Sequence, residues 1–102
     1  MHKYNIYVGM FDKDTKQQEL SNTEFLNIVR KVMRLSFINN YTIIKAKGHY
    51  QSNTMTVCEP AIIIEIISDV LCVDLLDKIK YKLCNLLNQE SVLVIKQSIE
   101  VL

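Results

Sequence analysis

Several polar and aromatic side chains lie near the ends of segments whose patterns predict β-strands. Lysine, tyrosine and histidine beside carboxylates and an amide suit an anionic, ring-bearing molecule such as a nucleotide. Few such groups are needed to fix a small ligand in a concave site. The candidate ligand-binding residues are Tyr7, Lys47, His49, Tyr50, Glu59, Gln89 and Glu90.

An acid–base site would have to use His49, because the only other histidine is His2 at the start of the chain. Glu59 lies across the predicted hairpin from His49, and a histidine beside a carboxylate can move protons near neutral pH. No serine–histidine–aspartate order or nucleophile elbow accompanies them. We therefore assign no catalytic residue and favour a protein without enzymatic activity. The alternative is a small dimeric α/β-barrel-type enzyme that uses His49 and Glu59 for acid–base chemistry.

Metal and cofactor sites find little support. The segment "DKDTKQQE" starts at Asp12 like a calcium-binding loop, but Lys16 occupies a ligand position and Gln17 replaces the required glycine. The only glycines, Gly9 and Gly48, are too far apart in sequence to form a phosphate-binding loop. We expect neither a metal ion nor a cofactor.

The cysteines also lack a metal-binding or redox pattern. Cys58, Cys72 and Cys84 are widely spaced and form no C-x-x-C pair. Widely spaced cysteines of this kind are typical of buried, reduced thiols in a cytoplasmic protein.

Length and composition indicate one compact domain over residues 1–102. The chain is 49% apolar and carries a formal net charge of +1. A near-neutral charge argues against nucleic-acid binding and against attachment to a membrane surface. No apolar run approaches the ~18 residues of a membrane span. We expect a cytoplasmic protein, in the host cytoplasm if a phage encodes it.

The hydrophobic patterns predict the order strand, helix, strand, strand, helix, strand. Ser21 and Glu24 form a capping-box pair at the start of the first helix. Asp69 is expected to cap the second helix, and Asn88 to end it in the left-handed conformation, so that Asn88 to Ser91 form a turn. Pro60 is expected to mark a bulge or an unpaired point. The expected segments are strands at 4–9, 41–50, 55–68 and 91–101 and helices at 21–35 and 69–87.

This order is typical of a ferredoxin-like β-α-β-β-α-β sandwich, an α+β fold with two helices on one face of an antiparallel sheet. The other face should be polar in a monomer. Two strands instead carry apolar residues on both faces, which indicates an interface. We predict a homodimer or higher homo-oligomer that buries the helix-free face. The candidate interface residues are Ile63, Ile67, Leu93, Ile95 and Ile99.

Short motifs resemble a family of small bacterial and phage proteins of unknown function. They are "YVG" at residues 7–9, "AKGHY" at 46–50, Glu59, and "NQESVLV" at 88–94. Members of that family open with a strand ending in glycine, carry an A-x-G-aromatic strand and close with a Q-E-S-V motif. The resemblance implies a ferredoxin-like fold and no established activity.

Taken together, these observations favour a non-enzymatic, homo-oligomeric binding protein. The composition, rich in lysine, asparagine and isoleucine, also resembles that of small phage proteins that inhibit host defence. The predicted function is inhibition of host defence, either by sequestering a small anionic, nucleotide-like ligand or by blocking a host defence protein.

Overall fold

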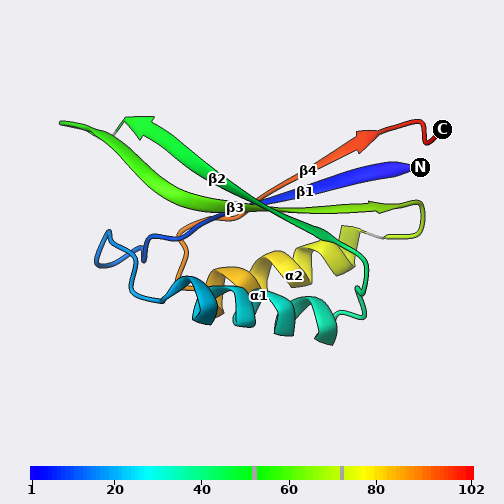
Figure 1. Ribbon diagram of the computed structural model, residues 1–102, viewed down its shortest axis with the longest axis horizontal. Helices are drawn as coiled ribbons and strands as arrows, with labels where there is room; N and C mark the ends of the chain where they lie inside the picture. Colours follow the sequence, from blue (N-terminus) through cyan, green and yellow to red (C-terminus); the bar gives the residue numbers. More distant parts are fainter. Residues whose placement is uncertain (52, 72) are drawn as a thin grey trace.

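The computed structural model describes residues 1–51, 53–71 and 73–102. Its elements follow the predicted order and confirm the ferredoxin-like fold, in which two helices cover one face of a four-stranded sheet (Figure 1). The elements are β1 (His2–Gly9), α1 (Asn22–Leu35), β2 (Thr42–Gln51), β3 (Thr56–Ser68), α2 (Val73–Leu86) and β4 (Leu93–Ser98).

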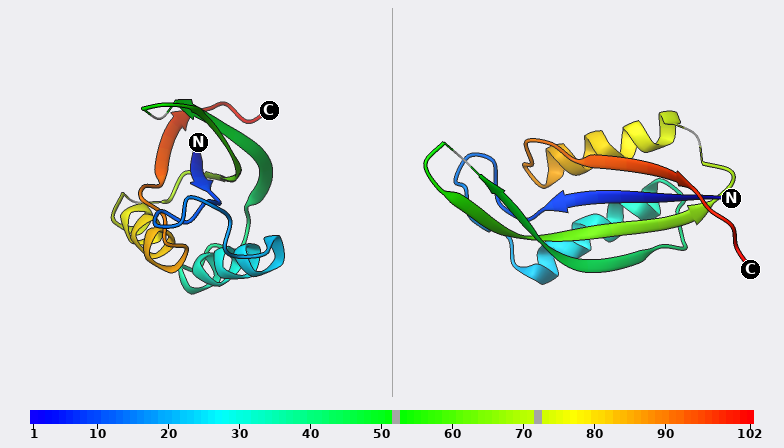
Figure 2. Two further views of the ribbon diagram at one scale, coloured as in Figure 1. Left: turned by 90° about the vertical axis from the view of Figure 1, so that its left-hand side faces the viewer. Right: turned by 90° about the horizontal axis from the view of Figure 1, so that it is seen from above.

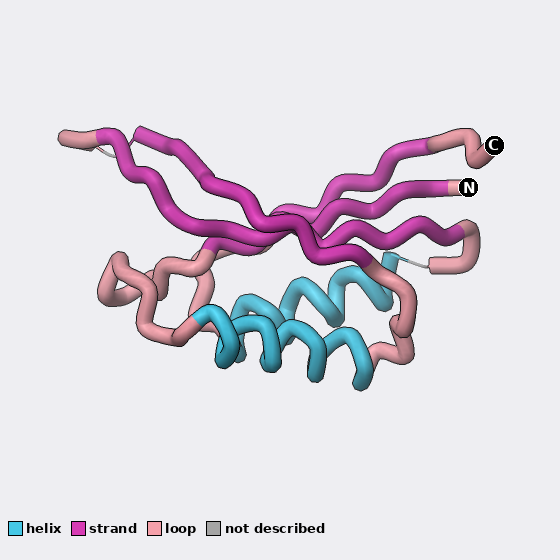
Figure 3. Tube along the Cα trace, in the orientation of Figure 1, coloured by secondary structure: helices cyan, strands magenta, loops and turns pink. Residues whose placement is uncertain are grey.

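The strands lie in the order β2-β3-β1-β4, and each neighbouring pair is antiparallel. Seen along the sheet and from above, both helices lie beneath the same face, and the opposite face carries no helix (Figures 2 and 3). The chain therefore has one core, between the sheet and the helices.

Helix α1 begins where the capping box predicts. The Ser21 hydroxyl accepts a hydrogen bond from the Glu24 backbone N–H at 3.1 Å, and the Glu24 carboxylate accepts one from the Ser21 N–H at 3.1 Å. Both bonds satisfy N–H groups that a helix start leaves unpaired. The helix then buries one face against the sheet through Phe25, Val29, Val32 and Met33.

Alternation along the strands decides which side chains enter the core. On β3, Ile62, Ile64 and Ile66 face the helices and are buried, while Ile63 and Ile67 face the other way. Strand β1 repeats the pattern with Tyr4, Ile6 and Val8 inside. The buried apolar residues are Tyr4, Ile6, Val8, Met10, Phe25, Val29, Val32, Met33, Ile38, Ile62, Ile64, Ile66, Leu76, Ile79, Leu83, Leu87 and Val92.

The helix-free face exposes apolar side chains, as predicted, between polar ones such as Asn5 and Glu65. Tyr7 on β1 pairs with Ile63 on β3 and with Leu93 on β4, and Ile63 pairs with Ile44 on β2, so one apolar row crosses the sheet. Leu93 is 57% exposed. Ile67 and Ile95 are exposed on the same face, and Ile63 and Ile99 are partly exposed.

The hairpin formed by β2 and β3 extends beyond the other strands. Gly9, the last residue of β1, pairs with Ala61, so residues 47–51 and 56–60 pair only with each other. The two strands project past the end of β1 as a two-stranded ribbon, at the left of Figure 1. Both faces of this ribbon lack a covering helix.

Pro60 does not interrupt β3, so of the two predicted alternatives the bulge is wrong and the unpaired point remains. Its partner is Lys47 in a continuous register, and its carbonyl accepts a hydrogen bond from Met10 N–H at 2.9 Å. In an antiparallel strand the N and O of one residue face the same neighbour. The nitrogen of Pro60 therefore faces the side where β1 has ended, and no bond to β2 is lost.

Helix α2 begins at Val73, so the prediction that Asp69 caps it is wrong. The Ser68 hydroxyl accepts a hydrogen bond from Val70 N–H at 3.1 Å, and this local turn keeps Asp69 outside the helix. Strand β4 is also shorter than predicted, from Leu93 to Ser98. Within the described ranges, no helix combines the length and the hydropathy needed to cross a bilayer.

The cysteines differ from the expectation of buried thiols. Cys58 is exposed because it lies on the projecting ribbon, and Cys84 is half-buried against the core. Cys72 lies outside the described residues.

The end of α1 contains a residue type that its backbone disfavours. Phe37 has φ 58°, and Ile38 N–H donates to Met33 O at 3.0 Å, which is the bond pattern of a helix end that usually contains glycine. The Phe37 side chain is 89% exposed, so its burial does not offset the cost of this conformation.

We expect Phe37→Gly to raise the free energy of unfolding by about 1 kcal/mol, since glycine adopts the left-handed conformation without steric cost. Urea denaturation measures the change. Phe37→Ala removes the same ring but keeps the strain, so its stability should stay near that of the wild type. Equal stability of the glycine and alanine variants would contradict this explanation.

Candidate functional site

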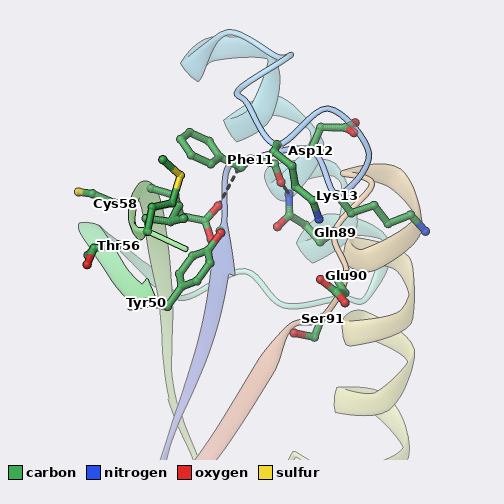
Figure 4. A pocket seen from close by; sticks show the side chains of 14 residues that line it. Phe11, Asp12, Lys13, Tyr50, Thr56, Cys58, Gln89, Glu90 and Ser91 are labelled. Carbon is green, nitrogen blue, oxygen red and sulfur yellow. Dashed lines mark hydrogen bonds between the residues drawn. The ribbon is translucent and has the colours of Figure 1, made fainter. Parts of the chain in front are cut away.

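A cavity of about 770 Å³ lies at the end of β1. Three segments surround it: the loop between β1 and α1, the outer part of the β2–β3 hairpin, and the loop between α2 and β4 (Figure 4). Its lining residues are Gly9, Phe11, Asp12, Lys13, Lys16, Tyr50, Met55, Thr56, Val57, Cys58, Glu59, Gln89, Glu90 and Ser91.

The Glu59 carboxylate is held against the backbone of β1. One carboxylate oxygen accepts a hydrogen bond from Phe11 N–H at 3.0 Å (Figure 4). A Cβ atom added to Gly9 would lie 2.7 Å from the other oxygen, so only glycine leaves room for this carboxylate. Gly48 is the cross-strand partner of Glu59 and flanks it on β2. The two glycines of the chain therefore border the same acidic side chain.

Tyr50 lies on the same face of the hairpin as Glu59, because residues 48 and 50 of β2 pair with residues 59 and 57 of β3. Desolvation, followed by the negative charges of Glu59 and Glu90, raises the pKa of the Tyr50 hydroxyl. Tyr50 therefore retains its proton and presents a hydrogen-bond donor to the cavity.

The loop between α2 and β4 is both a turn and part of the cavity wall. Asn88 has φ 49°, which confirms the left-handed helix end predicted for it. Gln89 is only 7% exposed, and its side-chain amide donates to Phe11 O at 2.8 Å and to Leu87 O at 3.3 Å. Gln89 thus joins this loop to the residue whose N–H holds Glu59.

Asn88 makes a second connection between the two loops. Its side-chain amide donates to Asp12 at 2.8 Å and to Asp14 at 2.9 Å, and its carbonyl accepts from Lys13 N–H at 2.9 Å. The bond from Asn88, and then the N–H groups of Asp14 and Thr15, lower the pKa of the Asp12 carboxyl. The carboxylates of this turn are therefore occupied by protein donors.

The structure brings together Tyr50, Glu59, Gln89 and Glu90 of the predicted ligand-binding residues. Tyr7, Lys47 and His49 do not line the cavity. Tyr7 lies farther along the helix-free face, between Ile63 and Leu93.

Lys47 and His49 lie on the opposite face of the ribbon from Glu59. His49 pairs with Cys58, and its Nε2 lies 3.9 Å from the Cys58 sulfur, whereas Glu59 pairs with Gly48. Neighbouring residues of a strand face opposite sides of the sheet. The acid–base pair of His49 and Glu59, considered in the sequence, is therefore not formed.

The loop between β1 and α1 forms part of the cavity wall, which the sequence did not indicate. Phe11, Lys13 and Lys16 line the cavity, and Ser91 completes the opposite wall. The loop is charged and has no periodic pattern, so nothing local marked it as a site. The positions of the glycines could have marked the site. The chain has only two, and both lie next to the Glu59 carboxylate.

No protein-family model matches the chain, and a search of curated proteins finds no match. Solved structures do match. A phage S-adenosylmethionine (SAM) lyase in complex with S-methyl-5'-thioadenosine aligns over 94% of this chain and 79% of its own, with 20% identity and a TM-score of 0.72. A phage SAM lyase without ligand aligns over 94% and 78%, with 21% identity and a TM-score of 0.68. At this identity the likeness shows the fold.

The comparison contradicts the predicted non-enzymatic, sequestering function. The matching structures are those of an enzyme. The ligand bound to the matching lyase is an adenosine thioether, which contains the expected ring system but carries no negative charge.

The position of Glu59 can be tested without knowing the ligand. We expect Gly9→Ala to displace the Glu59 carboxylate from Phe11 N–H, because the new Cβ and the carboxylate cannot occupy the same space. The Phe11 amide should lose protection from hydrogen exchange, measured by NMR.

Gly48→Ala is the matched control. A Cβ at Gly48 would lie 3.8 Å from the Glu59 side chain, an ordinary contact distance, so the Phe11 amide should keep its protection. Equal protection of the Phe11 amide in the Gly9→Ala variant and the wild type would show that Gly9 does not make room for Glu59.

Proposed function

We propose that this protein is a lyase that cleaves SAM and releases S-methyl-5'-thioadenosine, and that the cavity beside Glu59 is its active site. The bond that breaks joins the sulfonium sulfur to Cγ of the amino-acid chain, and its electrons remain on sulfur. Cγ then bonds to the carboxylate oxygen of the same molecule, or Cβ gives a proton to a carboxylate of the cavity as a double bond forms. Neither route requires water or a second substrate.

One observation carries this proposal. A phage lyase with this fold binds S-methyl-5'-thioadenosine. On the same fold this chain has a cavity of about 770 Å³, within the ~300–1,000 Å³ typical of small-molecule sites. Phe11, Met55 and Val57 add apolar surface for a flat ring system.

The carboxylates of the cavity suit a substrate that is positively charged at sulfur and a product that is neutral there. SAM carries a positive sulfonium, and Glu59 and Glu90 present carboxylates from two walls. Carboxylates attract the sulfonium before the reaction and lose that attraction when the sulfur becomes a neutral thioether. This difference in charge favours binding of SAM and release of the thioether product.

Incubation of the purified protein with SAM, followed by chromatography, tests the proposal. We expect release of S-methyl-5'-thioadenosine together with a four-carbon amino-acid product. Glu59→Gln keeps the shape and an acceptor for Phe11 N–H but removes the charge, so kcat/KM should fall at least about tenfold.

Asp77→Asn is the control for this experiment. Asp77 is exposed on α2, outside the cavity and away from the helix-free face. Its variant should cleave SAM at the wild-type rate. Intact SAM after prolonged incubation with the folded wild-type protein would contradict the proposed function.

We further propose that copies of this chain associate through the helix-free face of the sheet. The apolar row of Ile44, Ile63, Tyr7 and Leu93 runs across this face, and Ile67 and Ile95 extend it. Monomers rarely expose so continuous an apolar surface. A stable interface removes ~800 Å² per subunit from solvent. Association would also cover the side of the cavity formed by the projecting hairpin.

Light scattering coupled to size exclusion measures the mass in solution. We expect a multiple of the 11.9 kDa chain mass for the wild type. Leu93→Glu places a charge at the β4 end of the row, on an exposed position, and should shift the protein towards the monomer. Lys78→Glu, on the exposed side of α2, should leave the mass unchanged. A monomeric wild type at micromolar concentration would exclude this interface.

A further inference from the structure

The charges that line the cavity are separated in space. Lys13 and Lys16 come from the β1–α1 loop, whereas Glu59 comes from the hairpin and Glu90 from the α2–β4 loop. Asp12 also lines the cavity, but its carboxylate accepts hydrogen bonds from Asn88 and from two backbone N–H groups of its own turn. Asp12 stays ionised, because these bonds lower the pKa of its carboxyl. Among the residues of the β1–α1 loop that line the cavity, two lysines therefore outnumber one aspartate.

Backbone hydrogen bonds fix the turn that contains the two lysines. Lys13 N–H donates to Asn88 O, and Lys16 N–H donates to Asp12 O, both at 2.9 Å. Asp12 N–H closes the turn on Gln17 O at 2.9 Å. Lys16 has φ 60°, a conformation that residues with side chains rarely adopt, so the turn holds it against its local preference.

Within the described residues, the lysine ammonium groups form no close ion pair, although the charge of Lys13 contributes to the lowered pKa of Asp12. In the part of the chain that the structure describes, neither Lys13 nor Lys16 forms a salt bridge. Figure 4 shows Lys13 beside Gln89, on the wall opposite Tyr50. Two ammonium groups on a fixed turn next to a cavity, neither of them in a salt bridge with a described residue, are available to an anionic group.

We propose that Lys13 and Lys16 bind the carboxylate of the amino-acid part of SAM and select substrates that carry it. This inference rests on the proposed lyase function. The amino-acid end of SAM carries a carboxylate and an ammonium on one carbon, and the sulfonium lies in the middle of the molecule. The cavity presents two lysines beside Asp12 on one wall and the carboxylates of Glu59 and Glu90 on the others. The separation of charge orients the substrate, with the carboxylate at the β1–α1 loop and the sulfonium near Glu59.

Two probes that differ in this carboxylate test the inference. Sinefungin is an analogue of SAM that keeps the carboxylate and a positive charge but has no sulfonium to cleave, whereas S-methyl-5'-thioadenosine lacks the amino-acid part. The variant is Lys13→Met with Lys16→Met, which keeps the length of both side chains. Lys78→Met, on the exposed face of α2 and away from the cavity, is the control.

Isothermal titration calorimetry measures the affinity of each protein for each probe. In the double variant we expect the Kd of sinefungin to rise at least about tenfold, while the Kd of S-methyl-5'-thioadenosine stays within about twofold of the wild-type value. Added salt should weaken sinefungin binding more in the wild type than in the double variant. The control should bind both probes as the wild type does.

Two results would overturn the inference and leave the proposed function standing. One is an unchanged Kd for sinefungin in the double variant. The other is an equal rise in the Kd of both probes, which would mean that the lysines only support the fold of the loop. A wild-type protein that binds neither probe would overturn the inference together with the proposed lyase function.

Discussion

The contact between the Glu59 carboxylate and the backbone at the end of β1 organises this site. An acidic side chain on the helix-free face of a sheet would ordinarily point into solvent. Here the carboxylate lies over Gly9, which has no side chain to displace it, and accepts the N–H of Phe11. The hydrogen bond from Phe11 and the absence of a Cβ at Gly9 thus fix the position of the Glu59 carboxylate, and the other cavity residues lie around it.

The surrounding loops are joined to each other more than to the sheet. Gln89 bonds to the carbonyl of Phe11, and Asn88 bonds to Asp12 and Asp14, so the loops after β1 and after α2 form one unit. Phe11 therefore donates its N–H to Glu59 on one wall, and its carbonyl accepts a hydrogen bond from Gln89 on the other wall. The cavity is held together by polar contacts at the surface, and the apolar core beneath positions the helix end from which Asn88 and Gln89 extend.

The sequence predicts those features that depend on local pattern. The order of elements, the capping box at Ser21, the alternation of isoleucines on β3 and the left-handed Asn88 all follow from residues a few positions apart. The features that were missed depend on register. A shift by one residue moves a side chain to the other face, and His49 and Glu59 lie on opposite faces because Gly48 is the residue that pairs with Glu59. The start of α2 was misplaced because one serine hydroxyl forms a competing turn.

The proposed enzymatic activity leaves no motif in the sequence, for a chemical reason. A reaction that breaks a carbon–sulfonium bond starts from a good leaving group, and the substrate supplies its own electrons for the new bond. Such a site needs shape and a few charges, and it requires neither a nucleophile motif nor a metal cluster. No local sequence pattern marks Glu59, Tyr50 and Glu90 as a site. They become a candidate site only because the fold brings them together at one cavity.

The most direct test of this account is the crystal structure of the protein with S-methyl-5'-thioadenosine. The account predicts the ligand in the cavity bounded by Phe11, Tyr50 and Gln89, with its sulfur nearest to the Glu59 carboxylate. Binding at another place, or a cavity that remains empty at saturating ligand concentration, would contradict it.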